Sequence, residues 1–269
     1  MLYFKNGEFE INDTKENELV LLKISNSLFS LSKSNVFLNR LAIGGIYHKN
    51  YYNTICKGFY NNKNIVFNAK NTILSEFLYN LKHNLCNYGI FFINKNNKLY
   101  LQIYSGNTFL LDENQINFVE KYIKNENCFS VNKIKFKKFE NYYEENLINK
   151  IKPFNFKILC ENEHLSKQIK RCNLSNKSSK FKVYIFKNLK YKIYFDKKEL
   201  SLNKIFKNFT SYDIIESEII NKINLEKIKK VVNDKFIIYN KNTNNFDIFS
   251  TLKYLSWRIT NDKNYTKLV

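Results

Sequence analysis

Apolar positions recur at helical spacing in residues 71–85 of the chain. They stand three and four residues apart, so they would share one face of a helix. Asn71 and Thr72 precede this pattern and Glu76 follows closely, as at many helix N-termini. The pattern therefore predicts an amphipathic helix here. Its apolar face would consist of Ile73, Phe77, Leu78, Leu81 and Leu85.

Strand-like runs alternate with helical patterns along most of the chain. Residues 90–93 and 99–104 flank an Asn-rich turn and predict a hairpin or two successive strands. Further strands are predicted at 65–67, 156–160, 182–186 and 191–195, and further helices near 112–123, 140–151, 163–172 and 201–208. Such alternation favours βαβ units. The predicted fold class is α/β, with a Rossmann-like, mostly parallel sheet and helices on both faces.

The chain contains few glycines and one proline, so the sequence defines the boundaries between its elements and domains only approximately. Gly44-Gly45 suggests a turn after an apolar stretch. We predict an N-terminal extension at 1–50 and an α/β domain at 51–212, with a reduced, basic helical insertion at 133–151. From about 213 the pattern changes, and 213–269 is interpreted as a C-terminal appendage.

The net charge of +20 comes from 44 Lys and Arg against 24 Asp and Glu. Such an excess repels itself in a compact fold unless an anionic partner neutralises it, and nucleic acid is the commonest partner of this kind. A base composition rich in A and T would favour the same Lys, Asn and Ile, which gives part of the bias a second explanation. No apolar run approaches the roughly 18 residues of a spanning helix, so no membrane partner is predicted.

The chemistry-bearing motifs of common enzymes are absent from the sequence. Neither a glycine-rich phosphate loop nor a nucleophile elbow occurs. His48, His83 and His164 lie far apart, and the five cysteines form no C-x-x-C pair. We therefore predict no catalytic residues, no metal, no cofactor and no small-molecule substrate, and expect that the protein is not an enzyme.

Basic residues alternate with aromatic ones in two segments, 133–139 and 180–192. Lysines can neutralise phosphates while rings stack on unpaired bases. In 182–186 the alternation also fits a plain strand with lysines outward and aromatics in the core. The candidate RNA-binding residues are Lys57, Lys63, Lys70, Lys133, Lys135, Lys137, Lys138, Lys167, Lys170, Arg171, Lys187 and Lys190.

Several segments between about 52 and 205 resemble, in the same order, motifs of the bacterial and organellar small-subunit ribosomal protein two family. Gly58, Ile65 to Phe67 and Thr72 match one motif of that family. Phe129-Ser-Val-Asn132 and Asn162-Glu163-His164-Leu165 resemble two others. The resemblance implies a Rossmann-like sheet and binding to small-subunit rRNA and neighbouring ribosomal proteins. The early histidine motif and the tryptophan-glycine motif of the family are missing.

The leading hypothesis is therefore a structural component of the small ribosomal subunit. Its expected location is the ribosome of the mitochondrial matrix, as an organelle-encoded protein without a targeting signal, or else of a bacterium with a reduced, AT-rich genome. Two alternatives stay open. One is a plasmid- or virus-encoded DNA-binding protein, and the other is a degenerate, non-catalytic α/β enzyme, which would carry convergent polar groups at the carboxyl ends of its strands.

Overall fold

The computed structural model describes residues 8–11, 15–32, 39–59, 64–95, 97–151, 156–188 and 190–200, with short pieces at 239–240, 245–246, 248–249, 251–252 and 255–256. The chain divides into two compact units, Met1–Asn141 and Tyr142–Val269. The predicted helix at 201–208 and most of the predicted appendage lie outside these described residues. The unit boundary falls inside the predicted insertion at 133–151, and the predicted extension at 1–50 contributes to the first unit.

The first unit is built on a six-stranded sheet with the order β1-β5-β4-β2-β3-β6. β2 is parallel to β3 and β4, and β6 is parallel to β3, while β5 is antiparallel to β4 and β1. The sheet is thus mostly parallel, as the alternation of strands and helices predicted. Its strands are β1 (Glu8–Ile11), β2 (Arg40–Gly45), β3 (Ile65–Lys70), β4 (Tyr88–Lys95), β5 (Lys98–Ser105) and β6 (Phe136–Lys138).

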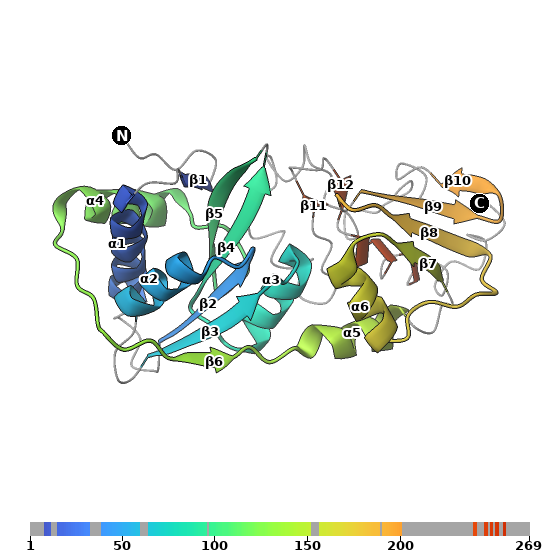
Figure 1. Cartoon of the computed structure of the whole chain (residues 1–269), viewed down its shortest axis with the longest axis horizontal. Coiled ribbons are helices and arrows are strands. Elements are labelled where there is room, and N and C mark those ends of the chain that lie inside the picture. Colours follow the sequence, from blue (N-terminus) through green and yellow to red (C-terminus); the bar gives the residue numbers. More distant parts are fainter. Residues whose placement is uncertain are drawn as a thin grey trace. The chain divides into compact units, whose positions relative to one another are not determined.

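Helices cover both faces of this sheet (Figure 1). The helices are α1 (Lys15–Ser32), α2 (Lys49–Phe59), α3 (Leu74–His83) and α4 (Glu113–Asn125). On one face, Ile24 of α1 and Ile55 of α2 belong to the same buried cluster as Ile43 and Phe92 of the sheet. Burying side chains of this size stabilises the unit by about 1.5–3 kcal/mol each before the entropic cost of ordering.

α3 covers the opposite face, where the Phe77 ring packs against two glycines of the sheet. A Cβ on Gly44 would come within 2.3 Å of the Phe77 ring, and one on Gly89 within 2.8 Å. The absence of a side chain at both glycines therefore allows the Phe77 ring to pack directly against β2 and β4. Gly44 and Gly45 are the last residues of β2 and not the turn that the sequence predicted. The hairpin of β4 and β5 is confirmed, and so is the helix predicted within 71–85, which spans Leu74–His83. The prediction that Leu85 lies on its apolar face is wrong, because Leu85 follows the helix with a positive φ of 52° and is 72% exposed.

The second unit holds a four-stranded sheet with the order β10-β9-β8-β7. β7 (Lys157–Cys160) and β8 (Phe181–Ile185) are parallel and are joined through α6 (Glu163–Arg171). β9 (Tyr191–Phe195) and β10 (Lys198–Leu200) continue the sheet antiparallel to their neighbours. α5 (Tyr142–Ile151) precedes β7, and a small ladder pairs β11 (Tyr239–Asn240) with β12 (Asn245–Phe246).

Asn162 explains where α6 begins. Its side-chain oxygen accepts a hydrogen bond from the Leu165 backbone N–H at 3.1 Å, which caps the first turn. Leu165 and Ile169 then project into the core of the unit, together with Val183 and Ile193 of the sheet. The strand and helix predicted at 156–172 are therefore confirmed.

Candidate functional site

The carboxyl ends of β2, β3 and β4 lie at one edge of the first unit's sheet, and backbone hydrogen bonds join them. The N–H of Asn71 donates to the carbonyl of Gly45 at 2.7 Å, and the N–H of Ile46 donates to the carbonyl of Phe92 at 3.0 Å. Gly45 has a positive φ of 82°, and a Cβ there would meet the Phe92 carbonyl oxygen at 2.1 Å. The glycine is therefore required for the chain to leave β2 close to β4.

Thr72 completes this connection between strand ends. Its hydroxyl donates to the carbonyl of Ala69 at 2.7 Å and accepts from the Gly45 N–H at 3.4 Å. Gly45 and Thr72 are 27 residues apart in sequence, and the parallel register of β2 and β3 brings them together. We call this region the carboxyl edge, defined by residues 45–50 and 70–73.

Two helices begin at the carboxyl edge and direct their N-termini toward it. α2 starts at Lys49 with no acidic residue in its first turn. α3 starts at Leu74, and its N-cap Ile73 offers no side-chain hydrogen bond. The first N–H groups of a helix have no partner within the helix and carry partial positive charge, so these ends favour anions. Glu76 in the first turn of α3 is buried and accepts from Asn141 at 2.9 Å, which makes α2 the more favourable end.

The side chains around the start of α2 are exposed, aromatic and basic. Tyr47, His48, Lys49 and Lys70 are all exposed. The Lys70 ammonium lies 5.3 Å from the centre of the Tyr47 ring, so a cation–π contact holds it beside the helix N-terminus. The His48 ring stacks on Tyr51 at 4.5 Å. No Asp or Glu occurs in residues 45–50 or 70–73, so the local charge is positive.

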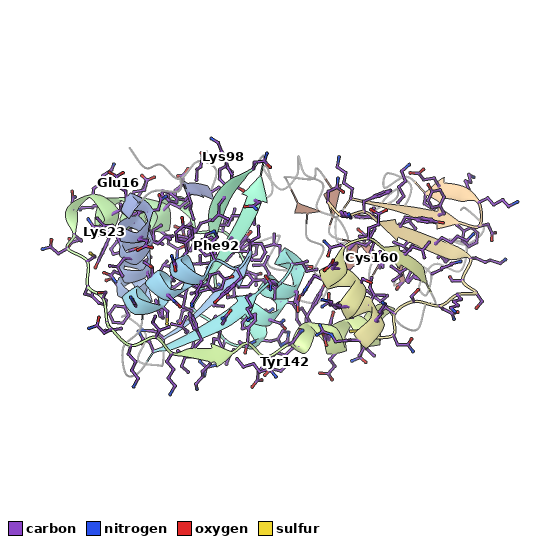
Figure 2. All side chains as sticks on the ribbon, viewed as in Figure 1. Glu16, Lys23, Phe92, Lys98, Tyr142 and Cys160 are labelled. Atoms are coloured by element: carbon purple, nitrogen blue, oxygen red, sulfur yellow. The ribbon has the colours of Figure 1, made fainter. Side chains whose placement is uncertain are left out.

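Tyr52 lies under this surface with its hydroxyl buried. Its ring meets the Tyr47 ring edge-on at 5.0 Å and stacks near Phe92 at 5.6 Å (Phe92 is labelled in Figure 2). Burial and the neighbouring Tyr47 raise the pKa of Tyr52, so the phenol stays protonated. Within the described part of the chain, its hydroxyl has no hydrogen-bond partner.

Few groups at this end of the sheet could perform acid–base or nucleophilic chemistry. The carboxylate of Glu10, near the end of β1, pairs with Lys98 at 2.6 Å, and the hydrogen bond from Lys98 lowers the pKa of Glu10. Figure 2 labels Lys98 at the β4–β5 turn. Thr72 is occupied by Ala69 and Gly45 as described above. Among the described residues, no group of three or more His, Cys, Asp and Glu could hold a metal ion.

The candidate RNA-binding residues do not converge on this edge, apart from Lys70. Lys57 lies in the last turn of α2, and its carbonyl accepts from the Val131 N–H at 3.2 Å. Lys133, Lys135, Lys137 and Lys138 are exposed along the segment that ends in β6. β6 is an edge strand, where lysines hinder pairing with other chains, so Lys137 and Lys138 have a structural explanation. Lys63 lies outside the described residues.

The other candidates belong to the second unit. Lys167 and Lys170 are exposed on α6, and Arg171 forms an ion pair with Glu144. Lys187 and Lys190 are exposed between β8 and β9. The sequence therefore identified one residue of the carboxyl edge and missed Tyr47, His48 and Lys49. The signal available was their position directly after an apolar, strand-like run.

No family model matches the chain, and no curated protein matches it either. Solved structures do match. One is a protein from Thermus thermophilus assigned as a phosphomannomutase, with a TM-score of 0.56 and 7% identity, over 76% of this chain and 60% of that one. Another is a phosphoglucomutase/phosphomannomutase family protein from Burkholderia thailandensis, with a TM-score of 0.48 and 10% identity, over 80% of this chain and 48% of that one. This chain spans about 60% of the first structure's length.

The likeness to the Thermus protein establishes an α/β fold of the kind found in that assigned phosphomannomutase. The prediction of a structural component of the small ribosomal subunit is wrong, because the fold is similar to that of the assigned phosphomannomutase. The alternative of a degenerate α/β enzyme agrees better with this result. The Thermus protein, which shares this fold, is assigned as an enzyme. The fold therefore does not support the expectation that this protein is not an enzyme. No helix in the described part of the chain is long and apolar enough to cross a membrane.

Proposed function

We propose that the first unit binds the phosphate group of a phosphorylated hexose at the carboxyl edge and does not catalyse phosphoryl transfer. The observation that carries the proposal is the start of α2, where a helix N-terminus without acidic residues faces Lys70, His48 and Lys49. Ligands of open α/β sheets bind outside the carboxyl ends of the strands. A phosphate monoester has the charge and the acceptor oxygens that such an end recognises.

The hexose part of the proposal comes from the Thermus structure, which shares the fold and is assigned as a phosphomannomutase. Tyr47 supports it from this chain's own residues, because an exposed ring beside a phosphate site offers a surface for the apolar face of a sugar. The non-catalytic part rests on the described carboxylate and hydroxyl groups at this end of the sheet. Glu10 is ion-paired, and the Thr72 hydroxyl donates to a backbone carbonyl, so neither is arranged as a base or a nucleophile.

The test is calorimetric titration of the full chain with mannose 6-phosphate and with mannose at low ionic strength. We expect the phosphorylated sugar to bind and inorganic phosphate to compete with it, while mannose alone does not bind. Equal binding of mannose and mannose 6-phosphate would refute a phosphate site. Conversion of mannose 1-phosphate to mannose 6-phosphate by the purified chain would refute the non-catalytic part alone.

Two lysine variants make the test specific to the carboxyl edge. Lys70→Ala removes the cation beside the α2 N-terminus and should weaken binding about 5- to 10-fold, the size of a charge-assisted contact at an exposed site. Lys57→Ala removes the same charge eight residues farther along α2 than Lys49, roughly 12 Å along the axis. It should leave the affinity within about twofold, since screening is strong beyond roughly 10 Å.

A further inference from the structure

The second unit's sheet has one buried face and one face whose side chains are exposed or half-buried. On β8, Phe181, Val183 and Ile185 are buried, while Lys182 and Tyr184 between them point the other way. The register extends this outward face across the sheet in two rows. One row runs Lys157, Lys182, Tyr194, Glu199, and the other runs Leu159, Tyr184, Lys192.

Large apolar groups are accessible on this outward face. Tyr184 is 37% exposed and Leu159 is 43% exposed, and Phe186, just after β8, is 37% exposed. The rings of Tyr184 and Tyr194 meet edge-to-face, 5.6 Å apart and at 88°. Two perpendicular rings present one face and one edge to an incoming group. Such an arrangement fits a flat partner that stacks on one ring and contacts the other.

The charge around these rings is positive. Lys157 and Lys182 are direct neighbours on adjacent strands, about 5 Å apart along the sheet, so their charges repel unless an anion lies between them. Lys187 and Lys190 add charge beside the rings, at the β8–β9 turn. Residues 156–200 together hold twelve Lys and Arg against four Asp and Glu.

One carboxylate opposes this charge on the outward face. Glu199 accepts hydrogen bonds from Lys192 at 3.2 Å and from the Tyr194 hydroxyl at 3.3 Å. The hydrogen bond to Glu199 raises the pKa of Lys192, so this lysine is occupied within the protein. Lys157 and Lys182 therefore carry the uncompensated charge of the face.

We propose that the outward face of β7–β10 binds single-stranded nucleic acid, with Tyr184 stacking on a base and Lys157 and Lys182 contacting the backbone phosphates. Exposed aromatic rings flanked by lysines on an open sheet are what unpaired bases and their phosphates require together. A duplex keeps its bases stacked inside and cannot use the Tyr184 ring. An acidic protein surface would satisfy the lysines but leave the exposed rings unexplained. The proposal is independent of hexose phosphate binding by the first unit.

The test is fluorescence anisotropy of a labelled dT12 oligonucleotide with the full chain at about 50 mM salt, where phosphate contacts are strong. Tyr184→Ala should weaken binding roughly 5- to 100-fold, the loss of one base stack, and Tyr184→Phe should restore it. Phe118→Ala is the matched control, because Phe118 is similarly exposed, at 39%, on α4 of the first unit. It should leave the affinity unchanged.

Two further variants test the charges. Lys182→Ala should weaken dT12 binding and flatten its salt dependence, while Lys167→Ala, which removes an exposed lysine from α6, should do neither. Glu199→Gln should tighten binding, because it frees Lys192. Should Tyr184→Ala fail to fold, ultraviolet crosslinking of the unaltered chain to dT12 should label the peptide that contains Tyr184.

The outcomes separate cleanly. The proposal is supported if dT12 binding weakens in Tyr184→Ala and is retained in Tyr184→Phe. Binding should also persist in saturating mannose 6-phosphate. No binding of dT12, equal binding of a blunt duplex of the same length, or equal losses in Tyr184→Ala and Phe118→Ala would each overturn the proposal, as would crosslinks confined to the first unit.

Discussion

Substitution of Asn26 should destabilise the first unit. Asn26 lies on α1 with no exposed surface, and its amide joins three parts of the unit. Its Nδ2 donates to the carbonyls of Gly58 at 2.8 Å and Phe129 at 3.1 Å, while its Oδ1 accepts from the Phe129 N–H at 2.8 Å. Asn26→Ala would remove all three hydrogen bonds and leave backbone groups of α2 and the 129 segment unsatisfied.

At about 1 kcal/mol for each hydrogen bond, the substitution should lower the free energy of unfolding of the first unit by about 3 kcal/mol. The assay is hydrogen exchange by mass spectrometry, because the chain has two units and one melting curve would not separate them. Amides of β2, at the centre of the sheet, report unfolding of the whole first unit. Peptides around Phe129 should also exchange faster through local opening.

Asn117→Ala is the matched control, since Asn117 is exposed on α4 and alanine has the higher helix propensity. It should leave the stability unchanged or raise it by up to about 0.7 kcal/mol. A change below about 1 kcal/mol in Asn26→Ala would refute the reasoning, because a loss that small is less than one buried and two partly buried hydrogen bonds require. So would a loss confined to the second unit.

Three further predictions concern caps and buried groups. Asp112→Ala removes the carboxylate that accepts the Gln115 N–H in the capping box and keeps the backbone N–H that donates to Gln115; it should cost about 1 kcal/mol in urea denaturation, whereas no loss would show that the side-chain cap is not formed. Tyr52→Phe should raise stability by about 1 kcal/mol, because the buried hydroxyl has no partner in the described structure, and a measured loss would show that it has one. Burial raises the pKa of the Cys86 thiol from 9.0 to about 12, so the folded chain holds this proton more tightly than the unfolded chain. Stability should therefore fall as the pH rises from 9 toward 12, less so in Cys86→Ala, and iodoacetamide at pH 8 should label half-buried Cys128 well before Cys86.

The elements that the sequence predicted correctly are those whose signals are local. The α3 helix follows from apolar spacing alone, and Phe77, Leu78 and Leu81 are indeed buried on one face. The β4–β5 hairpin follows from two strand-like runs around an Asn-rich turn, where Asn97 adopts a positive φ of 62°. Asn162 signals the start of α6 because its capping bond spans three residues.

The features that the sequence missed depend on distant contacts. Gly44 looks like a turn residue, yet it continues β2 by pairing with β3 and β4, and it is a glycine because the ring of Phe77, 33 positions later, occupies the space of its Cβ. The carboxyl edge forms only when the parallel register of β2 and β3 places Gly45 beside Thr72. No local pattern encodes that register, so the position of Tyr47, His48 and Lys49 after an apolar run did not by itself identify a site. The same holds for the outward face of β7–β10, which requires four strands in register.

Several of the acidic residues that offset the positive charge are engaged within the fold. In the described part of the chain, Glu10 pairs with Lys98, Glu144 with Arg171 and Glu199 with Lys192, and Glu76 is buried. These acidic groups are engaged within their own units, so they do little to offset the remaining lysines. The excess therefore resides on surfaces such as the carboxyl edge and the outward face of β7–β10, both of which combine lysine with exposed aromatic rings. We therefore expect binding at each surface to depend on the lysine and aromatic side chains of that surface: Lys70→Ala should lower the affinity for mannose 6-phosphate, and Tyr184→Ala the affinity for dT12.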